Sequence, residues 1–416
     1  MAHHSRNPFH VHDYRRWFGG TTLLSLSTAT GIAVNLLLID LTGSALIAGT
    51  VAAIVTLADL GGSILGGGLA DQQSRRRILR RTMLTAAALN LLLVAVLLLP
   101  LGLPAALVLS VCILCLVGGE FLVNLAMPSL DGSLKAVIRQ DAYTRAISAS
   151  QARDSVFSVV GTPVTGLLYA LHHTCPFLLR LLCQSSFVWV LSSIRTELGP
   201  AQQNAPHDDS RRPLPALGRA LQSYRAAFRF IGSVPALTRF VIAAPLVNVM
   251  ASLFAVWALF ALRAEGHSAT VIGVTLSGFA LGSVLGSAAT PFAADRVPTG
   301  WLAVVGLSAM TAMFAVLTLL PHTPLAIFLL GMCAMLPSPP LNAAIFSYVF
   351  ACTDLSMQGR VIAVFKGIGG LAVALAPLLA GFAVSLDVSR LVLSLSCVLA
   401  ATGVLILVTS SHVRAL

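Results

Sequence analysis

The chain has 416 residues, of which 57% are hydrophobic and only 10% are charged, and its mean hydropathy is +0.89. This composition excludes a soluble globular protein and predicts a protein of the lipid bilayer. The net charge of +11 is not accompanied by any nucleic-acid-binding motif. Basic residues of a membrane protein set its topology and contact anionic headgroups, so we expect membrane lipid, and no nucleic acid, as the partner of these charges.

About twenty apolar residues cross a hydrocarbon core of roughly 30 Å. The sequence divides into twelve such stretches, at 17–39, 44–69, 78–100, 103–128, 154–171, 176–194, 239–262, 270–294, 300–320, 324–350, 360–385 and 388–409. The N-terminus is polar and the first apolar run is too long for a cleavable signal peptide, so we expect that run to remain as the first helix.

Basic residues predict the orientation. With the N-terminus inside, nearly all Lys and Arg residues fall into loops on one side, and Arg180, Arg263 and Arg390 are the exceptions. Positive charge is retained on the cytoplasmic side during insertion, so both termini are predicted to be cytoplasmic. Arginine greatly outnumbers lysine, which is typical of a GC-rich bacterial genome, and we therefore expect a bacterial inner membrane.

A polar stripe runs along the first predicted helix. Thr21, Ser25, Thr28 and Asn35 are separated by four, three and seven residues, which places them on one helix face. Such a face meets protein or water rather than lipid. Ser25, Thr28 and Asn35 are therefore candidates for the lining of a substrate cavity, although ordinary hydrogen bonding between helices explains the stripe equally well.

Two acidic residues lie inside predicted spans. Asp59 precedes the inner end of the second helix by twelve residues, so it lies roughly 18 Å deep at 1.5 Å per residue. Glu120 lies in the fourth helix, with Asn124 one turn further on the same face. A carboxyl at membrane depth must be paired, hydrated or protonated. We predict that Asp59 and Glu120 bind protons and that Asn124 lines the cavity, and a structural partner for Asp59 is the alternative.

The stretch from Gly61 to Arg81 joins the second and third predicted helices. Gly62 and Gly66 lie one turn apart, a spacing that lets two helix backbones touch. Asp71 follows where the helix leaves the lipid, and five arginines come after it: Arg75, Arg76, Arg77, Arg80 and Arg81.

This stretch resembles the signature of the major facilitator superfamily, roughly G-x-x-x-D-R-x-G-R-[RK] between the second and third helices. Gly67, Asp71, Arg75 and Arg76 stand at matching positions, whereas Gln72 and Ser74 replace the usual arginine and glycine. The resemblance implies that the matching residues gate the cytoplasmic side. It also implies that the helix 2 aspartate approaches the start of helix 11, near Arg360, when that side is shut.

The segment after the fourth helix is similar to the enterobactin-exporter and macrolide-efflux branch of this superfamily. In that branch a proline ends helix 4, a short inside helix follows, and helix 5 carries G-P-x-x-G. The matching positions are Pro128, Tyr143, Arg145, Ala146, Pro163 and Gly166, with Gly161 displaced by one residue. The similarity implies export. A proline flanked by glycines permits a bend, and a static kink is the alternative. At the start of this fifth helix, Arg153 and Asp154 are expected to form a local ion pair.

The second half repeats the first. Arg145 and Gly166 are 21 residues apart, as are Arg360 and Gly381, and each interval has a proline near its end, Pro163 and Pro377. Asp295 is the counterpart of Asp71. These matches indicate duplication of a six-helix unit. We expect an N-terminal half at 1–194, a cytoplasmic linker at 195–238 with an amphipathic helix over 217–231, and a C-terminal half at 239–416.

The C-terminal half contains no acid in the middle of a predicted span. Its candidates for the cavity lining are the polar or aromatic residues Asn248, Ser252, Trp257, Asn342 and Lys366. Phe254 and Phe346 are further stacking candidates, although aromatic residues of membrane helices usually serve packing. Glycines recur every fourth residue at Gly278, Gly282 and Gly286, which predicts a second strip of close helix contact.

These patterns predict an all-α integral membrane protein with twelve transmembrane helices in two pseudo-symmetric six-helix halves. The sequence contains no Walker A lysine, GxSxG or HExxH motif, so we expect no enzyme, no cofactor and no metal site. We expect a monomeric secondary transporter that exports an amphipathic small molecule, such as a drug, siderophore or metabolite, in exchange for protons by alternating access. The alternatives are an importer or uniporter of the same fold, or a non-transporting sensor or partner protein.

Overall fold

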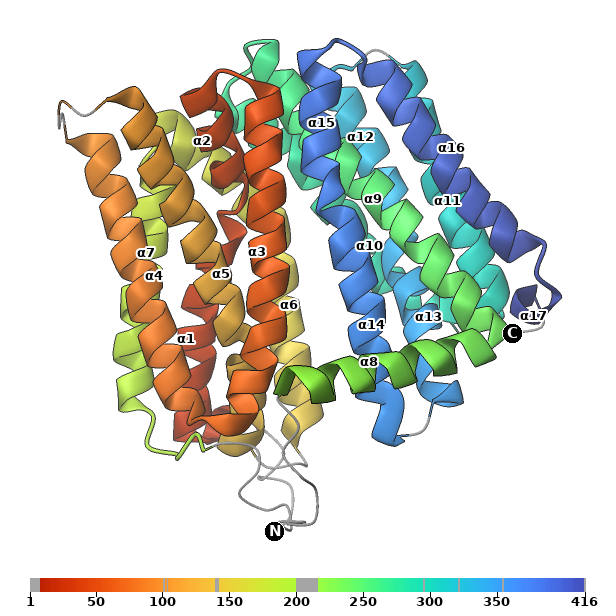
Figure 1. Ribbon diagram of the computed structural model, residues 1–416, viewed down its shortest axis with the longest axis horizontal. Coiled ribbons are helices and arrows are strands. Elements are labelled where there is room, and N and C mark those ends of the chain that lie inside the picture. Colours follow the sequence, from red (N-terminus) through yellow and green to blue (C-terminus); the bar gives the residue numbers. More distant parts are fainter. Residues whose placement is uncertain are drawn as a thin grey trace. The chain divides into compact units, whose positions relative to one another are not determined.

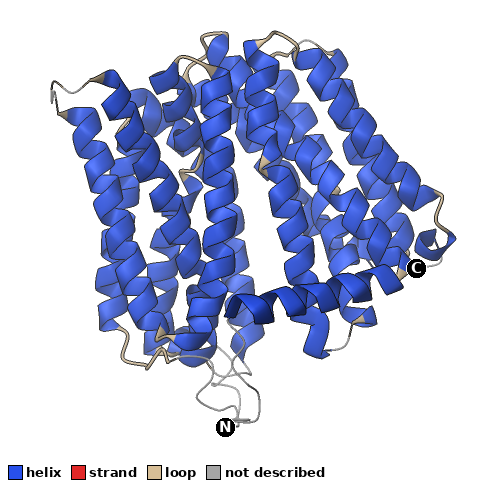
Figure 2. Ribbon diagram, in the orientation of Figure 1, coloured by secondary structure: helices blue, strands red, loops and turns tan. Residues whose placement is uncertain are grey.

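The computed structural model describes residues 8–99, 102, 104–138, 142–199, 216–294, 296–320, 322–353 and 355–414. All regular secondary structure over these residues is helical (Figures 1 and 2). After a short 3₁₀ turn at Pro8–His10, the helices are α1 (His12–Ala29), α2 (Ile32–Thr42), α3 (Ala45–Gln72), α4 (Arg75–Leu98), α5 (Ala105–Val137), α6 (Tyr143–Leu171), α7 (Cys175–Ser193), α8 (Ala216–Ser233), α9 (Pro235–Ala264), α10 (Ala269–Ala294), α11 (Thr299–Leu319), α12 (Pro324–Met335), α13 (Ser338–Cys352), α14 (Leu355–Val373), α15 (Leu375–Ser385), α16 (Ser389–Val408) and α17 (Ser411–Arg414).

Twelve helical segments of the described chain are long and apolar enough to cross a membrane, and each coincides with one of the twelve predicted spans. The protein is therefore a multi-pass membrane protein. Three predicted spans are interrupted inside the bilayer, so that each consists of two helices: α1 with α2, α12 with α13, and α14 with α15.

Prolines explain two of these interruptions. The break before α15 falls at Ala374, three residues before Pro377, because a proline ring clashes with the carbonyl group one turn earlier in the helix. The break before α13 falls at Leu336 and Pro337, and Pro339 and Pro340 follow in the first turn of α13. Proline is well suited to the first turn of a helix, so these prolines both end α12 and begin α13.

The third interruption, between α1 and α2, contains no proline. It falls at Thr30 and Gly31, where the backbone uses tight bonds such as Gly31 N–H to the Thr28 carbonyl oxygen at 3.1 Å and Ala33 N–H to the Thr30 carbonyl oxygen at 3.0 Å. Bonds of this i to i−3 type in the middle of a helix often mark a hinge.

Pro128 does not end its helix, contrary to the sequence-based expectation. It lies inside α5, which continues to Val137, and α6 then begins at Tyr143 without a separate short helix. Packing offsets the backbone hydrogen bond that the proline removes, because Leu134 and Val137 are buried in a core cluster that includes Trp17. The Trp17 indole also donates a hydrogen bond to the Ser133 hydroxyl at 2.7 Å.

Both predicted glycine strips lie at close helix contacts. A Cβ atom on Gly62 would meet the backbone of Phe121 and Leu125 of α5, and one on Gly66 would collide with the Leu125 carbonyl group. The second strip meets α12 and the start of its break, where Cβ atoms on Gly278, Gly282 and Gly286 would reach the carbonyl oxygens of Phe328, Met332 and Leu336. No side chain fits between these backbones, as expected for helices that associate through small residues.

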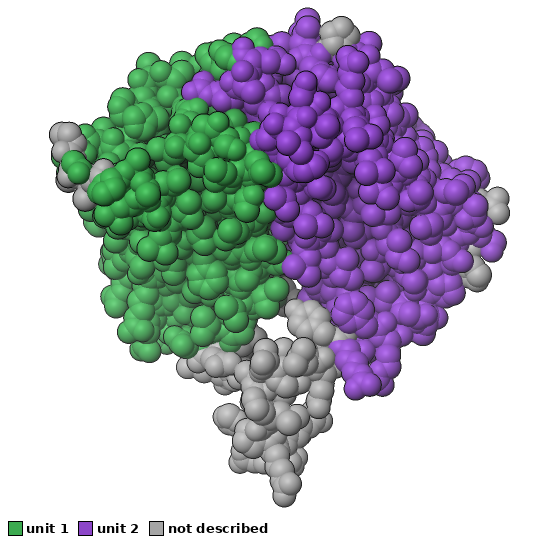
Figure 3. Space-filling view, turned by 45° about the horizontal axis from the view of Figure 1, so that its top comes forward, with its two compact units in different colours: residues 1–205, 266–274 green, residues 206–265, 275–416 purple. Residues whose placement is uncertain are grey.

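The chain divides into two compact units, coloured separately in Figure 3. Unit 1 comprises residues 1–205 and 266–274, and unit 2 comprises residues 206–265 and 275–416. The predicted amphipathic helix is present as α8 in unit 2, where it packs against α9 and α14. Ala227 and Ile231 are buried, whereas Arg225, Phe228 and Arg229 are exposed.

Candidate functional site

The two predicted acids of unit 1 lie on adjacent helices. Asp59 is on α3, and Glu120 and Asn124 are on α5. The Asn124 amide donates to the Asp59 carboxylate at 3.1 Å and to the Glu120 carbonyl oxygen at 3.2 Å. The glycine contacts described above lie directly beyond Asp59 on the same helix. Because Gly62 and Gly66 carry no side chain, α3 approaches α5 closely enough for this hydrogen bond to form.

A third helix contributes a cation to this cluster. Arg180 of α7 is only 7% exposed and forms an ion pair with Glu120, whose side chain is 14% exposed. The Arg180 Nε atom also donates to the Thr30 hydroxyl at 2.7 Å, and Thr30 is 2% exposed at the break between α1 and α2. The pair therefore links α5, α7 and the interruption of the first span.

The two carboxyls have unequal partners. Glu120 is paired with a guanidinium, whereas no ion pair joins Asp59 to a cation among the described residues, and its hydrogen-bond donor is a neutral amide. Asp59 still lies within electrostatic reach of both Glu120 and Arg180. An ionised carboxylate is costly inside a membrane unless a cation compensates it, so Asp59 is the acid of this cluster whose charge is less well compensated.

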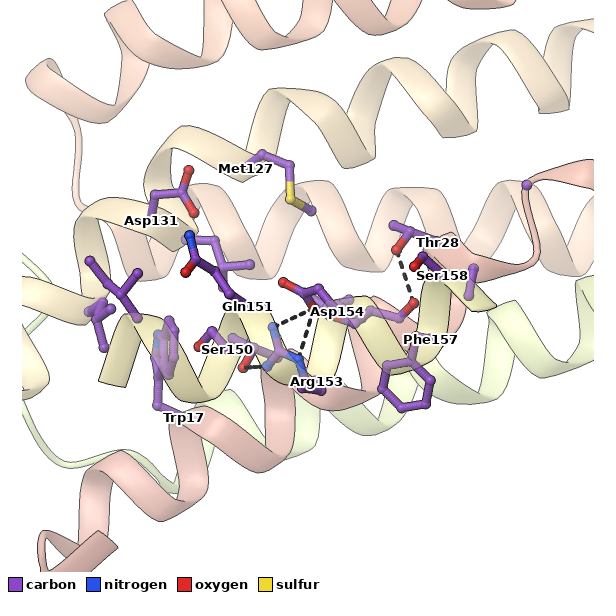
Figure 4. A pocket seen from close by; sticks show the side chains of 18 of the residues that line it. Trp17, Thr28, Met127, Asp131, Ser150, Gln151, Arg153, Asp154, Phe157 and Ser158 are labelled. Atoms are coloured by element: carbon purple, nitrogen blue, oxygen red, sulfur yellow. Dashed lines mark hydrogen bonds and ion pairs between the residues drawn. The ribbon is translucent and has the colours of Figure 1, made fainter. Parts of the chain in front are cut away.

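A cavity of about 950 Å³ opens in the same unit, between α1, α2, α5 and α6 (Figure 4). Ser25, Thr28 and Asn35 of the polar stripe line it, but Asn124 is not among its lining residues, and a role in substrate binding stays a prediction. Trp17, Leu24, Met127 and Phe157 supply apolar surface between the polar groups. The lining therefore combines apolar and polar groups, as a site for an amphipathic molecule requires.

The charged wall of this cavity is the predicted ion pair of Arg153 and Asp154. The Arg153 Nε and Nη2 atoms each lie 2.9 Å from the Asp154 carboxylate. The pair is tied to α1, because Arg153 donates to the Thr21 hydroxyl at 2.6 Å and Ser25 donates to Asp154 at 2.7 Å. The local ion pair was predictable from the sequence, but its position in a cavity wall was not.

A second cavity, of about 290 Å³, lies in unit 2 between α9, α13 and α14. It brings together three of the predicted lining residues, Asn248, Asn342 and Lys366, although 118 positions separate the first from the last. Ser252 and Trp257 are not among its lining residues. Trp257 is 1% exposed and packs against the rings of Phe254 and His322 at centroid distances of 6.3 Å and 4.6 Å, so its ring offers no free face to a ligand.

The arginines of the predicted gate bind backbone groups within unit 1. Arg75 donates to the Gly132 carbonyl oxygen at 2.9 Å near the end of α5. Arg76 donates to the Thr196 carbonyl oxygen at 3.0 Å and to that of Ile194, the residue that caps α7. Cations favour the carbonyl groups at helix C-termini, where the helix dipole is negative.

The remaining gate residues are only partly described. Outside its own stretch of α3, no atom of a described residue lies within 4 Å of where a Cβ atom on Gly67 would stand, and Arg360 is exposed on α14. Asp71 is the penultimate residue of α3, but its side chain lies outside the described part of the structure, as does the whole of Asp295. A gating role for these residues therefore stays a prediction.

The predicted bend residues lie at close contacts. Pro163 is inside α6, which the structure shows as one helix. A Cβ atom on Gly161 would stand 2.5 Å from the Cβ atom of Ala29, and one on Gly166 would collide with the carbonyl oxygen of Ala269, also in unit 1. In unit 2, Pro377 and Gly381 are buried on α15, just after the break in that span. The glycines thus serve close packing in this conformation, and bending stays a prediction.

No group of three or more His, Cys, Asp or Glu side chains suited to a metal ion occurs in the described part of the chain.

Residues 17–349 match the sequence model of the Major Facilitator Superfamily. No curated protein is significantly similar to the chain in sequence. Several solved structures share the fold at 12–14% identity, which shows the fold alone. A point mutant of the nucleoside transporter NupG superposes with a TM-score of 0.73 at 12% identity, over 95% of this chain and 99% of that one.

A bacterial homologue of the iron transporter ferroportin, in an inward-facing state, gives a TM-score of 0.67 at 13% identity and covers 95% of this chain and 98% of that one. A D-xylose-proton symporter gives 0.60 at 14% identity, with coverages of 94% and 96%. These proteins carry different substrates, so the shared fold does not select one.

Proposed function

Because the chain belongs to the Major Facilitator Superfamily, we propose that it is a secondary transporter that exports an amphipathic small molecule in exchange for protons. The twelve membrane-spanning segments and the shared transporter fold supply the frame. The D-xylose-proton symporter shows that this fold supports proton coupling. The export direction rests on the similarity of the Gly161–Gly166 segment to the bend motif of exporters.

The observation that carries proton coupling is the unequal pairing of the two acids in unit 1. Glu120 forms an ion pair with Arg180, so a cation compensates its carboxylate. Among the described residues, Asp59 has a hydrogen bond from Asn124 and no ion pair, so taking up a proton removes the cost of an uncompensated charge in the membrane. Asp59 then alternates between a protonated state and an ionised state, and the ionised state is stable only when water or a cation reaches it.

Asn124 is placed to sense that alternation. Its amide contacts the Asp59 carboxylate and the Glu120 carbonyl oxygen together. The Glu120 carboxylate and Arg180 both lie within electrostatic reach of Asp59, and Arg180 donates to Thr30 at the break of the first span. A change of charge at Asp59 therefore acts on the point where α2, which helps to line the large cavity, meets α1.

Transport by the wild-type protein in proteoliposomes tests the proposal. A panel of amphipathic compounds is offered with a pH gradient imposed in either direction and with the gradient collapsed by an ionophore. The proposal predicts movement of a compound against the proton flow that stops when the gradient collapses. Movement along the proton flow indicates an importer, and equal movement without a gradient indicates a uniporter. Either result contradicts proton-coupled export.

A further inference from the structure

The cavity of unit 2 is lined by Lys366, which has no ion-pair partner among the described residues. We propose that this cavity binds the anionic group of an amphipathic organic ligand, a carboxylate, with Lys366 as its counter-ion. Asn248 and Asn342 donate hydrogen bonds to the same group. The inference rests on the proposed function only in taking the ligand to be a transported molecule, since binding itself requires no transport.

The first step concerns the position of the charge. Lys366 lies six residues after Arg360, the first residue of its span, so it is about 9 Å into the span at 1.5 Å per residue. A cation inside a membrane helix is costly unless it is paired or faces a water-filled cavity. Lys366 lines the cavity and is exposed there.

The second step concerns the missing counter-ion. No hydrogen bond or ion pair joins Lys366 to any residue that the structure describes. The described carboxyl side chains of unit 2 are Glu265 and Asp387, and both lie outside the membrane spans. Neither neutralises a charge within the span. An anion that enters the cavity can therefore pair with Lys366. The dielectric constant there is lower than in water, so a charge-assisted hydrogen bond is strong.

The third step concerns the neighbouring groups. Asn248 of α9 and Asn342 of α13 are exposed in the cavity. Asn248 has no hydrogen bond to a described residue, and Asn342 reaches only the Ser338 hydroxyl at 3.5 Å. Each amide offers N–H donors, and a carboxylate has two oxygens to accept them. Donors from three helices thus converge on one anionic group.

The fourth step concerns the rest of the ligand. Phe346 and Phe365 line the same cavity, and Gly369 and Gly370 leave part of its α14 wall without side chains. A volume of about 290 Å³ equals that of roughly ten waters at ~30 Å³ each. This space accommodates an anionic head with the first part of an apolar body, and the aromatic rings contact that body.

The rarity of lysine in this chain supports a ligand-binding role for Lys366. The chain contains 24 arginines and two lysines, Lys135 and Lys366. Arginine therefore supplies nearly all of the positive charge, including the buried partner of Glu120. The compact ammonium of lysine leaves more of a small cavity free than a planar guanidinium does, and its charge suits a single anionic group.

The two lysines also provide the test. Purified full-length protein in detergent is acylated with an amine-reactive reagent, and the rates at Lys366 and Lys135 are measured by peptide mass spectrometry. The reaction is repeated with 4-phenylbutyrate, octanoate and 2-naphthoate, with the neutral analogue 4-phenylbutanol, and with inorganic phosphate. Lys135 is exposed near the end of α5 and serves as the internal control.

The proposal predicts that at least one carboxylate slows acylation of Lys366 by roughly tenfold near ten times its Kd, because about one tenth of the sites is then free. Lys135 keeps its rate, and the neutral analogue protects neither lysine. The N248A and N342A variants need higher carboxylate concentrations for the same protection. A K135M variant behaves as the wild type.

Three results overturn the proposal. The first is that Lys366 fails to react even without ligand, which would show that the cavity is closed. The second is that no carboxylate protects Lys366. The third is that phosphate or the alcohol protects Lys366 as well as the carboxylates do, which would show that the site does not select an amphipathic carboxylate. Because labelling in detergent uses no gradient, failure here is distinct from failure of proton-coupled export, which the flux assay measures.

Discussion

At the scale of single residues, the chemistry of unit 1 depends on which acid has a cation beside it. Arg180 and Glu120 are both largely buried and compensate each other, and Arg180 also holds Thr30. Asp59 has a neutral amide as its donor. A buried charge that loses its partner costs far more free energy than the ion pair contributes. Substitution of Arg180 or Glu120 alone should therefore destabilise the protein more than substitution of both.

A double-mutant cycle checks this pairing. R180M leaves the Glu120 carboxylate uncompensated, and we expect it to lower the free energy of unfolding in detergent by about 3 kcal/mol or more. E120Q alone leaves a buried guanidinium without its anion and should also destabilise. The E120Q/R180M protein should recover much of the loss. Additive effects of the two substitutions would contradict a direct pair.

His322, which lies outside the membrane spans, should make the stability of the folded protein depend on pH. Partial burial lowers the pKa of His322 from its ordinary value, and the charge of Arg390 lowers it further, although Glu265 opposes the shift. The pKa in the folded protein is then lower than in the unfolded chain. The folded state therefore loses stability as the pH falls below the unfolded value of about 6.5.

Thermal unfolding between about pH 7.5 and about pH 5.5 measures this effect. The wild-type midpoint should fall more steeply with acidification than that of H322Q. The exposed His10 supplies a control, because H10Q should keep the wild-type slope. Identical slopes for wild type and H322Q would show that His322 does not contribute.

At the scale of helices, glycine contacts set the geometry of the acid cluster. Gly66 touches the backbone of α5, whereas Gly67, the next residue, faces open space. The G66A variant should push α3 away from α5, stretch the Asp59–Asn124 hydrogen bond and destabilise the protein by roughly 1–3 kcal/mol. G67A should be neutral or slightly stabilising because alanine favours the helix. Denaturant unfolding compares them, and equal effects would refute the contact.

Hydropathy predicted the twelve spans because each span must satisfy its backbone hydrogen bonds internally and present an apolar surface to lipid. The glycine spacing likewise predicted close contacts for Gly62 and Gly278, because glycines four residues apart lie on one helix face and can be recognised from a short stretch of sequence. Continuation of α5 past Pro128 was not predictable in this way. It depends on contacts with Trp17, more than a hundred positions earlier in the chain.

The candidate site was predictable only one residue at a time. The sequence marked Asp59, Glu120 and Lys366 because charge is rare in membrane helices. It could not reveal that Arg180 pairs with Glu120, sixty positions away, nor that the first span breaks at Thr30, where no proline signals it. Trp257 was marked for its ring, and the core conceals that ring. Such pairings depend on tertiary packing.

At the scale of the whole molecule, the two units carry different chemistry. Unit 1 holds the acids and the larger cavity, and unit 2 holds the lysine-lined cavity without a carboxyl in its described spans. The proposed transport cycle assigns proton binding to unit 1 and recognition of an anionic group to unit 2. The central claim is that Asp59 is the residue that exchanges protons.

The most direct test is proton movement driven by a transported compound in proteoliposomes, compared between D59N and D40N. Asp40 is a suitable control because it belongs to the same unit and accepts a hydrogen bond from Tyr169 at 2.8 Å at the far end of α2. We predict that D40N retains compound-driven proton flux and that D59N loses it while still exchanging the compound across the membrane. Undiminished proton flux in D59N would contradict the account.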